Sequence, residues 1–62
     1  MCESNAYIIK DGQESLLMNS VETVRQEDKK LRLINMFGEE KLINASIKEI
    51  DLVKHKILIE TE

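Results

Sequence analysis

The chain has 62 residues, 34% of them charged, and a formal net charge of -3 at pH 7. A chain this short buries only about 60% of the surface that its unfolded form exposes, so we expect a single domain over residues 1–62 whose thin core needs a metal or a partner subunit. One cysteine excludes an internal disulfide, and the acidic balance with one Tyr, one Phe and no Trp argues against nucleic-acid binding.

The beginning of the chain shows no targeting segment. Glu3 stands where a secretory leader would carry basic residues, and no apolar run approaches the roughly 20 residues of a membrane span. The use of a single cysteine is typical of a reducing compartment. We therefore expect a cytoplasmic protein with no membrane contact.

The first third of the chain reads as a hairpin. Residues 2–10 alternate modestly as a strand does, Asp11-Gly12 suits a tight turn, and residues 15–18 form the returning strand. Residues 19–20 interrupt the pattern. The segment 21–25 fits either a helical turn or a strand after a small kink, and we favour the strand.

The middle of the chain predicts one further strand. Residues 26–30 form a charged connection, residues 31–34 alternate and end apolar, and Gly38 gives the free backbone that a turn requires.

Residues 40–60 carry the clearest pattern and predict a long strand, a tight turn near Lys54 and a return strand. The alternation shifts by one residue between Ile47 and Ile50, as a β-bulge would produce. The same isoleucines also fit a helical spacing, but the β-branched content favours strands. Asp51 is expected to fix the turn through side-chain hydrogen bonds.

These segments predict an all-β fold: a small compact barrel or sandwich of about five to seven short antiparallel strands. Open edges on so small a sheet invite pairing with a second copy, so a homodimer is expected.

Few residues could carry chemistry. The sequence has one His, one Cys, no Gly-rich phosphate loop and no CxxC or HExxH pattern, so we expect no enzymatic activity. His55 stands between two lysines in the expected turn. It is either an exposed turn residue, which we favour, or a metal ligand or contact to an acidic partner.

Cys2 is a candidate metal ligand because of its position. Removal of Met1, which is expected before a small second residue, would leave a free amine and a thiol on one residue. These groups form a five-membered chelate, and the deprotonated amide nitrogen of Glu3 would extend it to a set of nitrogen and sulfur donors suited to nickel(II) or copper(II). Two Cys2 residues on a two-fold axis would give a symmetric site with one metal per dimer. The alternative is a small apolar residue at the start of a strand.

Several segments together resemble one known family. The most specific is residues 47–57, read IKEIDLVKHKI; the others are Met1-Cys2, residues 16–18 followed by Val21, residues 31–33 and residues 37–39. Over nearly the whole chain the sequence resembles the CooT family of small cytoplasmic nickel-binding accessory proteins of carbon monoxide dehydrogenase maturation. The resemblance implies a compact all-β homodimer in which Cys2 is the nickel ligand.

The sequence therefore predicts a metallochaperone that binds Ni(II) through Cys2, with Glu3, at a dimer interface and supports a nickel enzyme such as carbon monoxide dehydrogenase. The alternative is a small β-barrel interaction or RNA-binding module with no metal role.

Overall fold

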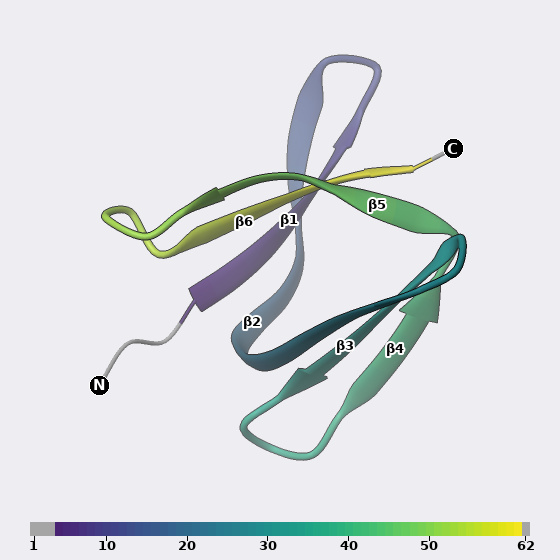
Figure 1. Ribbon diagram of the computed structural model, residues 1–62. Coiled ribbons are helices and arrows are strands. Elements are labelled where there is room, and N and C mark those ends of the chain that lie inside the picture. Colours follow the sequence, from purple (N-terminus) through teal and green to yellow (C-terminus); the bar gives the residue numbers. More distant parts are fainter. Residues whose placement is uncertain (1–3, 62) are drawn as a thin grey trace.

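A computed structural model describes residues 4–61, and all regular structure in that range is β-strand (Figure 1). The expected all-β fold with five to seven strands is therefore confirmed. The strands pair in the order β4-β3-β2-β1-β6-β5. Their bounds are β1 Ser4–Lys10, β2 Gln13–Glu27, β3 Lys30–Asn35, β4 Glu40–Ile43, β5 Ala45–Asp51 and β6 Lys56–Thr61.

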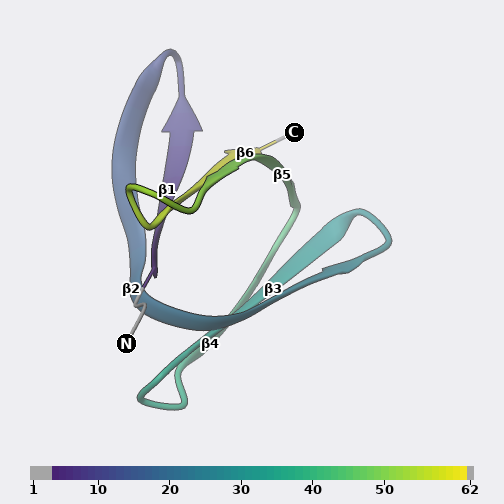
Figure 2. The same ribbon diagram turned by 60° about the vertical axis from the view of Figure 1, so that its left-hand side comes forward.

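A single residue, Asn44, joins the two edge strands of this sheet, β4 and β5. Because one residue spans only about 3.5 Å, the edges must meet at that point and the sheet has to curl. The result is a half-barrel (Figure 2). The side chain of Gln26 on β2 reaches across it, with Nε2 donating to the carbonyl oxygen of Ala45 on β5 at 3.4 Å.

The sheet is mixed, whereas only antiparallel strands were expected. Four of its neighbouring pairs are antiparallel, but β1 and β6 run parallel, with Ala6 opposite Ile57 and Ile8 opposite Ile59. The two strands are far apart in sequence. Turn residues in the sequence predict only hairpins between consecutive strands, so they could not predict this pair. The parallel pair arises because the chain crosses from one sheet edge to the other at Asn44.

The expected turns in the first half are confirmed, with one boundary corrected. Asp11 and Gly12 both have positive φ, 53° and 78°, as a tight hairpin turn requires. Residues 21–25 are strand rather than helix, after a kink at Ser20, where φ is 55°. The predicted connection over residues 26–30 is too long, because β2 continues to Glu27 and β3 begins at Lys30.

The region 40–60 is strand, so the helical alternative is wrong, but it forms two strands before the turn rather than one. Asn44 divides β4 from β5, and each pairs with a different neighbour. The predicted bulge is confirmed by a register shift between Ile47 and Glu49. The predicted role of Asp51 is also confirmed: its Oδ1 accepts hydrogen bonds from the backbone N–H groups of two residues in the β5–β6 turn, Val53 at 3.1 Å and Lys54 at 3.0 Å.

The core is thin, and five of the six strands contribute to it. The remaining strand, β4, contributes only the half-buried Ile43. Burial of one large aliphatic side chain stabilises a fold by roughly 1.5–3 kcal/mol. A cluster of this size therefore gives the folded chain only a small free energy of unfolding. The buried apolar residues are Ala6, Met18, Val21, Leu31, Leu33, Ala45, Ile57 and Ile59.

Asn35, at the end of β3, is the one buried polar residue among the described side chains, with 2% of its surface exposed. Its Oδ1 accepts from the backbone N–H groups of Phe37 at 3.0 Å and Glu39 at 2.9 Å, while its Nδ2 donates to Glu39 Oε1 at 2.7 Å. Asn35 therefore fixes the conformation of the β3–β4 loop.

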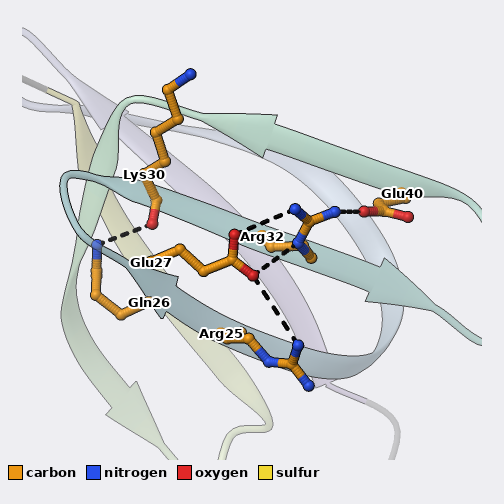
Figure 3. A network of polar contacts seen from close by, with 6 residues as sticks. All are labelled: Arg25, Gln26, Glu27, Lys30, Arg32 and Glu40. Carbon is orange, nitrogen blue, oxygen red and sulfur yellow. Dashed lines mark hydrogen bonds and ion pairs between the residues drawn. The ribbon is translucent and has the colours of Figure 1, made fainter.

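Charged side chains form a network on the convex face of β2, β3 and β4 (Figure 3). Arg32 donates from Nε and Nη2 to both carboxylate oxygens of Glu27, at 2.9 and 3.1 Å, and its Nη1 pairs with Glu40. The hydrogen bond from Arg32 lowers the pKa of Glu27 from its ordinary value. The network ties β2 to β3 and β4 on the side away from the core.

We predict that Asn35→Ala lowers the free energy of unfolding by about 1–3 kcal/mol, because two backbone N–H groups lose their acceptor. Asn19→Ala is the matched control, since Asn19 is exposed on β2, and we expect it to change stability by less than about 0.5 kcal/mol. Urea unfolding at fixed protein concentration measures both. Equal effects of the two substitutions would contradict the role assigned to Asn35.

A second prediction concerns acid stability. The folded-state pKa of Glu27 is depressed, so its contribution is present above the ordinary glutamate pKa of about 4.3 and is lost as pH falls through the folded value. Glu27→Gln should therefore destabilise the protein at pH 7, and the difference from wild type should shrink below about pH 4. Urea unfolding at pH 7, 4 and 3 measures this difference. A difference that is constant across this range would show that the Glu27 charge is not responsible.

Candidate functional site

The two predicted metal ligands, Cys2 and Glu3, lie outside the described residues 4–61. In the chain they precede β1, which begins at Ser4. Cys2 is two residues from Ser4, the first residue of β1, and two residues span at most about 7 Å. The start of β1 is therefore the described part of the chain that lies nearest in sequence to the predicted ligands.

A line of hydrogen bonds crosses four segments at the start of β1. The backbone N–H of Asn5 donates to the carbonyl oxygen of His55 at 2.9 Å, and Asn5 Oδ1 accepts from the N–H of Ser20 at 3.2 Å. The carbonyl oxygen of Ser20 accepts in turn from the N–H of Met36 at 2.9 Å. We call this line, Asn5, Ser20, Met36 and His55, the N-terminal rim.

The kink in β2 makes this arrangement possible. The pairing of β1 with β2 shifts between Ser4, opposite Val21, and Ala6, opposite Met18. The extra residue on β2 is accommodated by the positive φ of Ser20, which breaks the regular ladder and lets the Asn5 side chain accept its N–H. The sequence predicted the kink from residues 19–20, but nothing in its pattern indicated the role of Asn5.

Two turns flank the start of β1 at the rim, as both views of the fold show (Figures 1 and 2). The β3–β4 loop carries Phe37, whose surface is 71% exposed. The β5–β6 turn carries Leu52 and Val53, which are 77% and 88% exposed. Each of the two turns therefore leaves large apolar side chains in contact with water.

His55 lies at the rim in the β5–β6 turn and is exposed, in agreement with its interpretation as a turn residue. Its φ is 55°, a left-handed conformation that His tolerates better than most residues. Its backbone carbonyl anchors β1. Among residues 4–61 no three His, Cys, Asp or Glu side chains are grouped to hold a metal ion.

The charged side chain of Lys56, which follows His55 in the chain, points away from the N-terminal rim. Lys56 Nζ lies 2.8 Å from Glu14 Oε1 and 5.0 Å from the centre of the Tyr7 ring, so this side chain extends over the outer face of β1. The hydrogen bond to Glu14 raises the pKa of Lys56 from its ordinary value. Within the turn, the positive charge that remains exposed at the rim belongs to Lys54.

No helix in the described part of the chain is long and apolar enough to cross a membrane.

Comparisons with known proteins identify the family. The sequence model described as "CO dehydrogenase accessory protein CooT" matches residues 1–60. The crystal structure assigned to CooT from Carboxydothermus hydrogenoformans superposes with a TM-score of 0.90 and 39% sequence identity, covering 98% of both chains. An uncharacterised protein of Methanocaldococcus jannaschii is 38% identical over 60 residues, which are 97% of this chain and 98% of that protein. These matches show that the chain belongs to the CooT family of CO dehydrogenase accessory proteins.

Proposed function

We propose that this protein is a cytoplasmic nickel-binding accessory protein. Cys2 and the backbone nitrogen of Glu3 bind Ni(II) at the interface of a homodimer, which holds the metal for a nickel enzyme such as carbon monoxide dehydrogenase. The observation that carries the proposal is the position of Cys2. In a chain of an accessory-protein family, it stands two residues before a strand whose start is flanked by two turns with exposed apolar side chains.

The donor set fits the metal. Once Met1 is removed, the terminal amine, the thiolate and the amide nitrogen of Glu3 form two adjacent chelate rings of nitrogen and sulfur donors. Such donors suit nickel(II), which prefers a square-planar or tetragonal arrangement with nitrogen ligands. The described residues, 4–61, supply no competing cluster of metal-binding side chains.

A second copy completes the site. A two-fold axis between two chains brings two identical sets of donors together, giving one nickel per dimer. The metal is a cargo, so its site must allow ligand exchange with the receiving enzyme. Donors at the very end of a chain suit this purpose better than a closed cage of buried side chains.

We predict that reduced protein lacking Met1 binds about one Ni(II) per two chains, with thiolate-to-nickel absorption that Cys2→Ser abolishes. His55→Asn is the matched control. Asn tolerates the left-handed backbone of this position but cannot ligate as an imidazole does, and we expect it to bind nickel as wild type does. Titration followed by absorption spectroscopy, with the protein mass checked for Met1, measures all three.

Two outcomes would contradict the proposal. Wild-type protein with Met1 absent and the thiol reduced could give no nickel absorption, or Cys2→Ser could retain full uptake. Either result would favour an interaction module in which Cys2 has no metal role. Loss of uptake in His55→Asn would instead leave the nickel function in place and add the imidazole to the ligand set.

A further inference from the structure

The first half of β2 has a neighbouring strand on one side only. Within residues 4–61, β3 pairs with β2 from Val21 onward, whereas residues 13–18 pair with β1 alone. The β1–β2 hairpin therefore stands out beyond β3 and β4 in both views of the fold (Figures 1 and 2). We call residues 16–19 the open edge of β2. An unpaired strand edge is a template on which a further extended chain can pair.

A groove with a volume of about 400 Å³ lies beside the open edge, whose four residues form one of its walls. The other wall is formed by Asn35 and residues 39–41, at the end of β3 and the start of β4. Leu16 is 57% exposed and gives the groove an apolar side, while Met18, also in its lining, is buried. An open strand edge, an exposed apolar side chain and charged side chains are therefore found together in this groove.

Lys41 shows which chemistry the open edge accepts. Its Nζ donates to the backbone carbonyl oxygen of Leu17 at 3.2 Å, from a strand that is two places away in the sheet. The side chain of Lys41 is exposed. Because an exposed ammonium is strongly hydrated and stands on a flexible stem, a donor from an incoming chain can displace it. The Leu17 carbonyl is therefore an accessible acceptor for a second polypeptide.

Glu39 places a fixed negative charge on the opposite wall of the groove. Asn35 holds it at three points: Asn35 Nδ2 donates to Glu39 Oε1 at 2.7 Å, Asn35 Oδ1 accepts from the Glu39 N–H at 2.9 Å, and the Asn35 N–H donates to the Glu39 carbonyl oxygen at 3.0 Å. None of the ion pairs within residues 4–61 includes Glu39, whereas Glu40 pairs with Arg32. No cation of the described chain therefore neutralises this carboxylate.

We infer that the groove binds an extended segment of a partner protein, which adds to the open edge as a strand and places a lysine or arginine against Glu39. In strand addition, backbone hydrogen bonds supply affinity and alternate side chains supply specificity. Apolar side chains of the segment cover Leu16, and the charge of Glu39 selects a basic segment over an acidic one. The inference uses neither Cys2 nor Glu3, so it does not depend on nickel binding.

The experiment titrates an acetylated and amidated peptide, TVKVTV, into isotope-labelled protein in a metal chelator and follows the backbone amides by nuclear magnetic resonance. We expect saturable shifts at residues 16–19 and 39–41, and binding about tenfold weaker for the peptide TVEVTV, whose charge is reversed. Glu39→Gln should weaken the binding of TVKVTV about threefold, because it removes the charge but keeps an oxygen for Asn35. Glu22→Gln is the matched control, since Glu22 is exposed on β2 outside the groove, and it should bind as wild type does.

Methylation of the peptide backbone tests whether the segment binds as a strand. Two forms of TVKVTV carry methyl groups on alternate backbone nitrogens, one form on the odd positions and the other on the even ones. Because successive N–H groups of a strand point to opposite sides, only one of these sets faces the open edge. We therefore expect one form to lose binding and the other to keep it.

Three results would overturn the inference: no shifts at residues 16–19 with TVKVTV, equal effects of the two methylated forms, or equal effects of Glu39→Gln and Glu22→Gln. Shifts in the groove that depend on protein concentration without peptide would also overturn it, because they would assign the groove to a second copy of the chain. None of these results alters the nickel titration, so failure of the docking groove and failure of the nickel function are distinguishable.

Discussion

The link between β4 and β5 is the constraint on which this fold depends. The sheet places these two strands at its opposite edges, yet only Asn44 separates them in the chain. A flat sheet of six strands would hold its edges roughly 24 Å apart, five times the spacing between neighbouring strands, and a single residue cannot span that distance. The sheet therefore curls until its edges meet, and the curl creates the concave face that holds the core.

The same curl determines which segments meet at the rim. Once β5 has crossed to the far edge, β6 returns beside β1 in parallel, and the β5–β6 turn reaches the start of β1. The start of β1 is thereby placed next to two turns that are distant from it in sequence. The C. hydrogenoformans structure shares this fold over nearly its full length.

The sequence by itself determined the local features of this protein. The hairpin at Asp11-Gly12, the kink near Ser20, the bulge after Ile47 and the turn held by Asp51 each depend on a few adjacent residues, whose backbone preferences and side-chain hydrogen bonds act over short range. The family, and with it the candidate ligand Cys2, could also be read from the residues in order.

Only the tertiary structure decided which strands are neighbours. The break at Asn44 interrupts an alternation that continues on both sides of it, so the pattern of residues 40–51 reads as one strand. The parallel pairing of β1 with β6 and the burial of Asn35 likewise depend on contacts between segments that are distant in sequence. Such contacts cannot be predicted from the pattern of adjacent residues. The rim is a product of those contacts, because closing the sheet is what brings its four segments together.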